Sequence, residues 1–444
     1  ENVENKIRGM TSSPVIIIGG GLAGCEAAWQ LLQRGHAVTL YEMKPQKFSP
    51  AHKLPHLAEL VCSNSLKSNS LDNAHGLLKE EMRRLDSLII SCAEQCPVAA
   101  GTALAVDRLK FARAVEEKLL EHKLFTLIRQ EIKELPADAL TIIATGPLTS
   151  EAMSGTLKNL LGGAQLYFYD AIAPIIEADS INMDKVFQAS RYDKGTPDYL
   201  NCPLNHEEYE KLRQELLSGE KVALHSFEEI RHFEGCLPVE VLAARGKESL
   251  AYGPLKPVGL VNPRTGAIPH AVIQLRKENN EGTLFNMVGF QTKLTWPEQK
   301  RIFHLIPGLE NAEFARFGSI HRNTYIHSPS LLLPSLSLKT RKNIMLAGQI
   351  TGVEGYVESA AMGLWAGLNA SAQLSGGTLL PPPADTAIGS LVNYITSPLK
   401  PDNFQPMNVN FGLLPRLTGR ISKKDRPSLY SRRALDSLTE WLCY

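Results

Sequence analysis

Three glycines at the spacing G-x-G-x-x-G mark a stretch suited to binding a phosphate group. Gly19 permits a tight turn, Gly21 lets the backbone approach a pyrophosphate without an intervening Cβ, and Gly24 lets a helix pack closely against a strand. The amides at the start of such a helix can bind the diphosphate. Glu42 stands eighteen positions beyond Gly24, where its carboxylate can accept hydrogen bonds from both ribose hydroxyls of an adenosine.

The flanking residues supply the strands and the helix that must position these groups. Residues 15–18 form an apolar run typical of a strand buried on both faces, a helical pattern follows the glycines, and a second apolar run over residues 37–41 ends at Glu42. A 2′-phosphate would meet the Glu42 carboxylate, so FAD or NAD is expected here and NADP is not. The residues predicted to bind this cofactor are Gly19, Gly20, Gly21, Leu22, Ala23, Gly24 and Glu42.

Length, charge and cysteine content restrict the class of protein. At 444 residues the chain exceeds the ~250–300 residues of a usual single core, so we expect two domains or one domain with an insertion. The net charge is only +1, so a nucleic-acid partner would need a local basic patch. Seven cysteines in no metal-binding pattern, with no secretory signal, indicate a reducing cytoplasm. No apolar run reaches the ~18 residues of a transmembrane helix.

Later segments continue the alternation of strands and helices. Residues 44–60 predict a long loop, residues 75–96 a long helical stretch, and Asp107 is predicted to cap the next helix. Residues 140–147 predict a strand of the first sheet. From about Glu151 to about Pro329, short strands, prolines and aromatic residues predict an inserted, sheet-containing domain. A strand over residues 343–350 and a small-residue helix over residues 352–370 then restore the first pattern.

Longer strings carry a resemblance to a known family. The chain contains GGGLAG, ELVCSNSL, ATGPLTSEA, DYLNCP, FEGCLPVE, YGPLKPVGL, GFQTKLTWPEQKR, IPGLENAEFARFGSIHRNTY and AGQITGVEGYVESA. With these strings it resembles, from about Pro14 to its end, the TrmFO family of folate- and FAD-dependent tRNA (uracil-5-)-methyltransferases. The resemblance implies an α/β fold, the glutathione-reductase-type FAD-binding fold, with an inserted α+β domain. It adds four expected cofactor-binding residues: Thr145, Gly146, Gly348 and Gln349.

The resemblance also implies a domain division and a reaction. Residues 1–13 would be an extension, 14–150 and 330–444 the FAD-binding domain, and 151–329 the inserted substrate domain. In the family, methylenetetrahydrofolate gives its one-carbon unit to reduced FAD, which passes it to carbon 5 of the T-loop uridine of tRNA and reduces it to a methyl group. NAD(P)H supplies the electrons. The expected partners are therefore tRNA and folate, in the cytoplasm, with no membrane and no obligate protein partner.

This chemistry selects residues that could carry it. Carbon 5 of uracil is a poor nucleophile until a group adds to carbon 6, and a thiolate is suited to that addition. Cys62 and Cys236 are the candidates, and which of them attacks stays open. Polar residues after Cys62 are typical of a turn or helix start, whose amides can stabilise a thiolate. Tyr356 is a candidate to contact the flavin or the extruded base, and His321 resembles the histidine that stacks on the folate pterin.

Positive charge is densest near the C-terminus. From Arg416 to Arg433 the chain has seven cations against one anion. Arg420, Lys423 and Lys424 are predicted to bind tRNA phosphates. The alternative is a solvated helix whose cations pair with acids elsewhere.

Two other functions fit part of the pattern. An FAD- and folate-dependent enzyme that modifies the wobble uridine of tRNA shares the GGG-x-AG and AGQ strings, but it is longer by about 150–200 residues, enough for another domain, and works with a second protein. A flavin-bearing RNA-binding protein without catalysis would not need two thiols beside its cofactor. We therefore expect a methyltransferase that forms 5-methyluridine and binds no metal.

Overall fold

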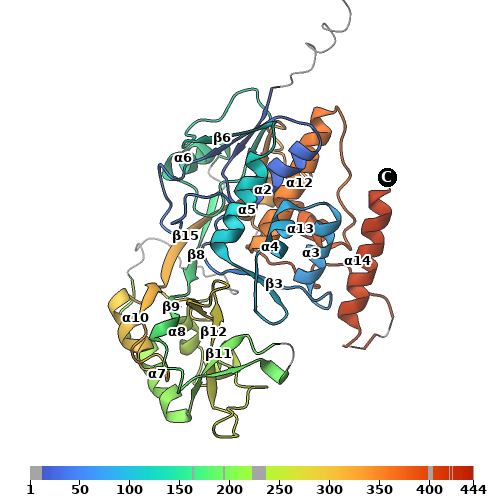
Figure 1. Ribbon diagram of the computed structural model, residues 1–444. Helices are drawn as coiled ribbons and strands as arrows, with labels where there is room; N and C mark the ends of the chain where they lie inside the picture. Colours follow the sequence, from blue (N-terminus) through green and yellow to red (C-terminus); the bar gives the residue numbers. More distant parts are fainter. Residues whose placement is uncertain are drawn as a thin grey trace, which may run out of the picture.

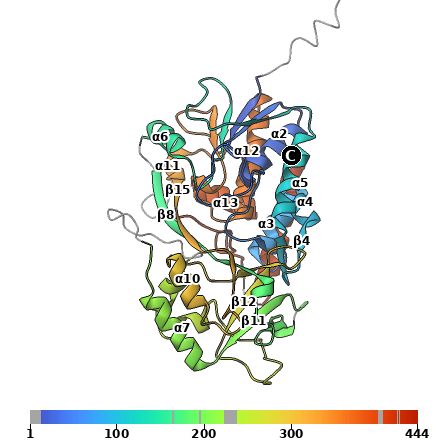
Figure 2. The same ribbon diagram turned by 60° about the vertical axis from the view of Figure 1, so that its left-hand side comes forward.

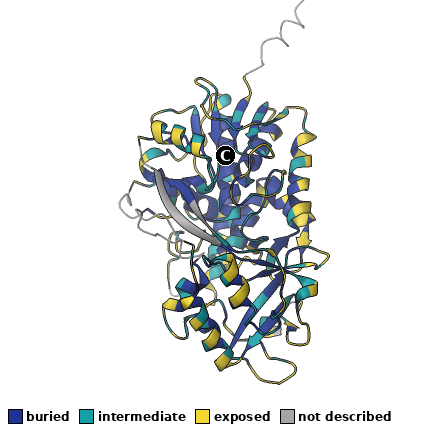
Figure 3. Cartoon of the chain, turned by 90° about the vertical axis from the view of Figure 1, so that its left-hand side faces the viewer, coloured by how far each residue is buried: buried dark blue, intermediate teal, exposed yellow. Residues whose placement is uncertain are grey.

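The computed structural model describes residues 13–162, 165–193, 196–222, 237–398, 404–419, 421–422 and 424–443. In these ranges the chain forms two sheet-containing parts, and a two-stranded ribbon runs between them (Figure 1). Buried residues are concentrated in the interior of both parts (Figure 3). None of the helices within the described ranges combines the length and the apolar character needed to cross a membrane.

A five-stranded parallel sheet forms the upper part of the molecule in Figure 1. Its order is β16-β7-β1-β2-β6, and its strands are β1 (Val15–Ile18), β2 (Val38–Glu42), β6 (Phe125–Arg129), β7 (Thr141–Ile143) and β16 (Ile344–Leu346). The apolar runs predicted to be buried strands are three of these, β1, β7 and β16. Because β1 pairs with β2 and with β7, its carboxyl end opens at the middle of the sheet edge, where ligands of open α/β sheets bind.

Helices α2 (Leu22–Gln33) and α12 (Tyr356–Leu374) pack against each other beside this sheet. A Cβ on Gly363 of α12 would lie 2.2 Å from the carbonyl oxygen of Ala23 in α2. That distance is far below van der Waals contact, so glycine is required for the helices to come this close. The small residues of the predicted helix therefore serve helix packing.

Two helix predictions need correction. The small-residue helix begins at Tyr356 because Gly352 and Gly355 adopt φ values of +87° and +116°, which a right-handed helix excludes. The long helical stretch over residues 75–96 is two helices, because Asp86 adopts a φ of +54° and Ser87 caps the second helix by accepting a hydrogen bond from the Ile90 amide. The predicted cap at Asp107 is confirmed, since its side chain accepts hydrogen bonds from two amides of the following helix.

The remaining elements of the upper part surround the parallel sheet. A small antiparallel sheet has the order β3-β5-β4, with β3 (Ser65–Ser68), β4 (Pro97–Val98) and β5 (Ala103–Val106). The helices are α3 (Ala74–Arg84), α4 (Leu88–Gln95), α5 (Arg108–Leu120), α6 (Glu151–Leu160), α11 (Ser328–Leu331), α13 (Ala387–Thr396) and α14 (Arg426–Leu442).

Two fully buried carboxylates hold helices of this part in place. Glu26 accepts hydrogen bonds from the first two amides of α4, and Glu81 accepts hydrogen bonds of 2.7 and 2.8 Å from the first two amides of α13. The N-terminal amides of a helix lack partners within the helix and carry partial positive charge, so each buried acid satisfies donors that would otherwise be unpaired.

A six-stranded antiparallel sheet forms the lower part, and it confirms the inserted α+β unit. Its order is β10-β11-β12-β13-β9-β14, with β9 (Ile175–Glu177), β10 (Phe187–Ala189), β11 (Tyr199–Leu204), β12 (Ala271–Lys277), β13 (Leu284–Met287) and β14 (Phe314–Arg316). Within the described residues, four α-helices accompany it: α7 (His206–Ser218), α8 (Val239–Ala244), α9 (Ser249–Tyr252) and α10 (Trp296–Phe303). This part has a hydrophobic core of its own.

The ribbon between the two parts consists of β8 (Gln165–Ile172) and β15 (Ser319–Ile326), which pair antiparallel (Figure 2). Tyr325 and Ile326 belong to the upper core, as do Met153 and Leu157 of α6. We therefore propose that the chain crosses between domains within the ribbon, slightly inside the predicted range of residues 151–329.

Candidate functional site

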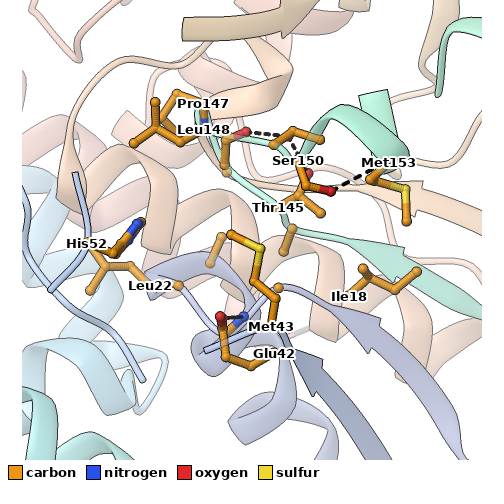
Figure 4. Close-up of a pocket in the computed structure, with 18 of the residues that line it drawn as sticks. Ile18, Leu22, Glu42, Met43, His52, Thr145, Pro147, Leu148, Ser150 and Met153 are labelled. Atoms are coloured by element: carbon orange, nitrogen blue, oxygen red, sulfur yellow. Dashed lines mark hydrogen bonds between the residues drawn. The ribbon is translucent and has the colours of Figure 1, made fainter. Parts of the chain in front are cut away.

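A cavity lies at the carboxyl edge of the parallel sheet (Figure 4). It is lined by residues at the ends of β1, β2, β7 and β16, four strands that are far apart in the sequence. All the predicted cofactor residues except Gly24 line it: Gly19, Gly20, Gly21, Leu22, Ala23, Glu42, Thr145, Gly146, Gly348 and Gln349. The fold therefore brings three separate glycine-containing segments around one space.

The three motif glycines have different surroundings. Gly19 has a φ of +106°, and a Cβ there would lie 2.4 Å from the Ala144 carbonyl oxygen. A Cβ on Gly24 would lie 1.9 Å from the Gly19 carbonyl oxygen, so this glycine serves packing beneath the turn. Gly21 precedes α2, and no atom lies within 4 Å of the position its Cβ would take. Open space at the amide end of a helix is what a bound diphosphate needs.

Glu42 lies at the carboxyl end of β2 and is 8% exposed. Its Oε2 accepts a 2.9 Å hydrogen bond from the Gly20 amide, and its Oε1 accepts one of 2.9 Å from the Lys44 amide. These bonds fix the carboxylate, and each oxygen keeps capacity to accept a further donor such as a ribose hydroxyl. The open helix terminus and this carboxylate fit an adenine dinucleotide.

A second cavity adjoins the first. The two share Val61, Pro147, Leu148, Gln349 and Tyr356 in their walls, so they meet at these residues. The second cavity is also lined by Cys62 and by side chains from β12, β13 and β15, so both parts of the molecule contribute to it. A ligand in the second cavity can therefore lie against Cys62 and next to a group bound in the first cavity.

Cys62 is half-buried in a loop that we call the Cys62 loop (residues 60–64). The hydroxyl oxygen of Tyr356 accepts hydrogen bonds from the Cys62 amide at 2.7 Å and the Ser63 amide at 3.2 Å. Arg108 and Arg316 donate to the Cys62 carbonyl oxygen at 3.3 and 3.2 Å. Tyr356 therefore engages two of the amides near Cys62, and Arg108 and Arg316 bring positive charge to the same loop. Stabilisation of a Cys62 thiolate by nearby amides stays a prediction.

The inserted part also holds the Cys62 loop. Arg276 of β12 donates a 2.7 Å hydrogen bond to the Ser63 hydroxyl, and the Asn64 side chain donates one of 2.9 Å to the Lys277 carbonyl oxygen. Glu278, the residue after β12, forms an ion pair with Arg108 at 2.6 Å. The position of the loop thus depends on contacts with residues more than 200 positions away in the sequence.

Burial and charge shape the ionisation of this site. Burial raises the pKa of the Tyr356 phenol above its ordinary value, so Tyr356 stays protonated at neutral pH. Burial lowers the pKa of Arg316 to about 10, and the neighbouring Arg108 charge adds to this effect. Burial lowers the pKa of Arg108, but the charge and the hydrogen bond of the Glu278 carboxylate raise it, and the net result is a pKa above its ordinary value. Both guanidinium groups remain charged at pH 7.

Several predicted site residues cannot be placed in the same way. Cys236, Arg420 and Lys423 lie outside the described residues. The backbone of His321 lies in β15 opposite Asp170, but its side chain is not among those described. Lys424 is exposed just before α14. The structure thus joins Cys62 and Tyr356 and leaves the other assignments as predictions.

Three arginines that donate hydrogen bonds to the Cys62 loop were not predicted from the sequence: Arg108, Arg276 and Arg316. Each lies in a helix or strand, and nothing in the neighbouring sequence distinguishes it from a surface cation. Arg276 is 8% exposed, and a buried guanidinium needs partners.

We predict that Lys79 makes stability depend on pH. Lys79 of α3 is fully buried, and its Nζ donates a 2.7 Å hydrogen bond to the Leu66 carbonyl oxygen in β3, close to the Cys62 loop. Burial lowers the pKa of Lys79 from 10.5 to about 7. Between these values the unfolded chain holds a proton that the folded chain has released. The free energy of unfolding therefore rises with pH over this range, and Lys79 destabilises the fold most below pH 7.

The variant Lys79→Met removes this titration. The unfolding free energy of the variant minus that of the wild type should fall by about 1–3 kcal/mol between pH 6 and pH 10, measured by urea denaturation. Lys118→Met, at an exposed position of α5, is the control and should show no such trend. A difference that stays constant over this pH range for Lys79→Met would contradict the prediction.

Known proteins resemble this chain over most of its length. Residues 14–378 match the family described as glucose inhibited division protein A. Two relatives, from Syntrophus aciditrophicus and Geobacter sulfurreducens, are each named Methylenetetrahydrofolate--tRNA-(uracil-5-)-methyltransferase TrmFO. They are 60% and 59% identical to this chain. Each alignment covers 96% of this chain, and the two alignments cover 97% and 98% of the respective relative. A solved structure of GidA from Aquifex aeolicus superposes with a TM-score of 0.66 at 15% identity, over 96% of this chain and 76% of that one, which shows a shared fold.

Proposed function

This chain belongs to the glucose inhibited division protein A family and, within it, to the TrmFO enzymes, and on that premise we propose that it forms 5-methyluridine in the T-loop of tRNA. Methylenetetrahydrofolate is the one-carbon donor. The observation that carries the proposal is that Cys62 lines the second cavity, and that its neighbour Val61 also lines the first cavity, which is suited to a dinucleotide. When bound in the first cavity, FAD supplies the carrier and the reducing equivalents for the one-carbon unit.

The residues of the chain divide the remaining work. Cys62 adds through its sulfur to carbon 6 of uracil, which makes carbon 5 nucleophilic. Arg108 and Arg316 stabilise the thiolate with their positive charges. Tyr356 fixes the backbone of the Cys62 loop, because its hydroxyl oxygen accepts hydrogen bonds from the Cys62 and Ser63 amides. Cys236 is the second thiol that the proposal places near the reacting atoms, and His321 is the proposed contact for the folate pterin.

The second cavity has polar groups suited to a ligand with carbonyl oxygens. The Asn286 side chain is 4% exposed and lines it, and its Nδ2 makes no hydrogen bond within the part of the chain that the structure describes. A buried amide donor without a partner is costly, so a ligand acceptor is expected there. Uracil and the pterin of folate both offer carbonyl oxygens that could accept this hydrogen bond.

The test is a transfer assay with labelled methylenetetrahydrofolate, NAD(P)H and a T-loop minihelix of tRNA. Label in 5-methyluridine is the expected product. Label only in a substrate with an anticodon stem and a wobble uridine would favour the wobble-modifying alternative. FAD binding and tRNA binding with no transfer to either RNA would favour a binding protein without catalysis. Replacing the target uridine of the minihelix by cytidine is the control and should abolish transfer.

We predict that the basic segment near the C-terminus contacts tRNA. Lys424 and Arg426 are exposed, whereas Arg433 is engaged within the protein, where its Nη2 donates a 2.6 Å hydrogen bond to the Pro415 carbonyl oxygen. Changing Arg420, Lys423, Lys424 and Arg426 together to glutamine should weaken tRNA binding and flatten its dependence on salt. Each lost phosphate contact changes the log–log slope by ~0.7–0.9.

The measurement is tRNA affinity at three salt concentrations. FAD content and NAD(P)H oxidation should stay at wild-type levels. The control neutralises three exposed cations of the parallel-sheet part, Arg113, Lys118 and Lys123, and should leave the slope unchanged. An unaltered slope in the four-residue variant would place the tRNA surface elsewhere.

A further inference from the structure

Three potential metal ligands meet in the lower part of the molecule, apart from both cavities. His206 is the first residue of α7, Glu248 immediately precedes α9, and His270 immediately precedes β12. One ligand atom from each lies within 4.8 Å of the others. None of the three residues lines the cavities described above.

The distances within this group suit a small tetrahedral ion. Nε2 of His270 lies 3.2 Å from Oε2 of Glu248. Zinc bonds to nitrogen and oxygen are about 2.0–2.1 Å long, so two ligands of a tetrahedral zinc ion lie roughly 3.3 Å apart. His270 and Glu248 already have this separation. A ligand atom of His206 lies within 4.8 Å of the other two, and because His206 is exposed its side chain can rotate to complete the ligand set.

The chemistry of His270 also points to a ligand. Its Nε2 is buried, and within the described residues it makes no hydrogen bond, because the Glu248 carboxylate contacts it outside hydrogen-bond geometry. The His270 ring packs edge-on against the rings of His206 and Tyr209, with centroids 4.8 and 4.9 Å away. The ring is thus held with its nitrogen toward the other two ligands.

The backbone around the three residues is fixed. The His270 amide donates to the Leu204 carbonyl oxygen at 3.0 Å, which ties the start of β12 to the end of β11. Asn205 and Glu208 form a capping box at the start of α7. The Tyr209 hydroxyl donates a 2.7 Å hydrogen bond to the Lys247 carbonyl oxygen, next to Glu248. Ligands on rigid elements lose little freedom when they bind an ion.

We propose that His206, Glu248 and His270 form a zinc site that cross-links α7, α9 and β12 in the inserted part of the protein. Two imidazoles and one carboxylate are a common zinc ligand set, with water in the fourth position, and imidazole favours zinc over magnesium or calcium. The site lies at the opposite end of β12 from Arg276, which holds the Cys62 loop. It stabilises the fold of this part and takes no part in methyl transfer.

The experiment uses the full-length flavoprotein, freed of metal with a chelator and dialysed against zinc chloride. The wild type should bind one more zinc ion per chain than His270→Ala or His206→Ala, and zinc should raise its Tm by several degrees. Each variant should bind at this site at least about 10–100-fold more weakly, the loss that even changes around the ligands cause. Glu207→Ala, at an exposed neighbour outside the cluster, is the control and should bind zinc like the wild type.

Cobalt(II) separates this site from the cysteines. Bound at His206, Glu248 and His270, cobalt should give visible tetrahedral bands without thiolate charge transfer, and His206→Ala should lose them. Equal zinc binding by the wild type and both histidine variants would overturn the proposal. So would a thiolate spectrum, or a wild type that takes up no zinc. His206→Ala keeps the test decisive if His270→Ala fails to fold, because His206 is an exposed residue.

Discussion

Replacing Cys62 by alanine should lower methyl transfer by about a thousandfold or more while FAD stays bound. Removing the nucleophile of an enzyme commonly costs this much or more, because the covalent route to the transition state is lost. Cys62 lines the second cavity and not the first, so the proposed cofactor site is unaffected by the change. The measurement is single-turnover transfer from labelled methylenetetrahydrofolate, with FAD absorbance recorded on the same samples.

Three further variants sharpen this test. Cys443→Ala removes an exposed thiol far along the chain and should behave as the wild type. Cys62→Ser replaces the thiol by a hydroxyl of similar size and should be nearly as inactive as Cys62→Ala, because a serine hydroxyl without a nearby base is a weak nucleophile. Cys236→Ala tests the second thiol. Wild-type turnover by Cys62→Ala would remove Cys62 from the mechanism, and loss of turnover in Cys236→Ala alone would assign the addition to Cys236.

Changing Gly21 to aspartate should give a folded protein without FAD. The position of its Cβ is open, and its backbone is extended with φ −77° and ψ −171°, so any residue can adopt it. The added carboxylate would stand where the diphosphate binds at the start of α2. Two negative groups in contact cost several kcal/mol, so the affinity for FAD should fall by more than about 100-fold.

Gly24→Val tests the packing role of the motif, which differs from the binding role. Its Cβ would lie 1.9 Å from a backbone oxygen, so α2 could not seat on β1, and we expect loss of the folded state. Flavin content by absorbance, together with circular dichroism, separates the two outcomes. Gly155→Asp, at an open glycine of α6, is the control and should keep both fold and flavin. Stoichiometric FAD in purified Gly21→Asp would refute the assignment of the site.

The sequence by itself was enough to predict the dinucleotide-binding half of the protein. Gly19, Gly21, Gly24 and Glu42 lie within twenty-four residues of one another, and the apolar runs beside them are typical of buried strands. Both signals depend on interactions between near neighbours in the chain: a turn that needs glycine, a helix that starts after it and a strand that ends in an acid. Local physics of this kind can be inferred without a structure.

Helix ends were less predictable, because they depend on single backbone conformations. The hydrophobic period over residues 75–96 continues through the break between α3 and α4, and only the positive φ of Asp86 interrupts it. Aspartate tolerates this conformation better than most residues but does not require it. The start of α12 was displaced for the same reason, by Gly352 and Gly355.

The surroundings of Cys62 were decided by the tertiary structure alone. Arg108, Arg316 and Tyr356 reach its loop from 46, 254 and 294 residues away. The same holds for the cluster of His206, Glu248 and His270, whose members are separated by whole helices. Each of these side chains is an ordinary polar residue in its own segment. Charge interactions and hydrogen bonds act over a few ångströms in space, so which polar groups meet depends on how the sheets and the ribbon place distant segments together.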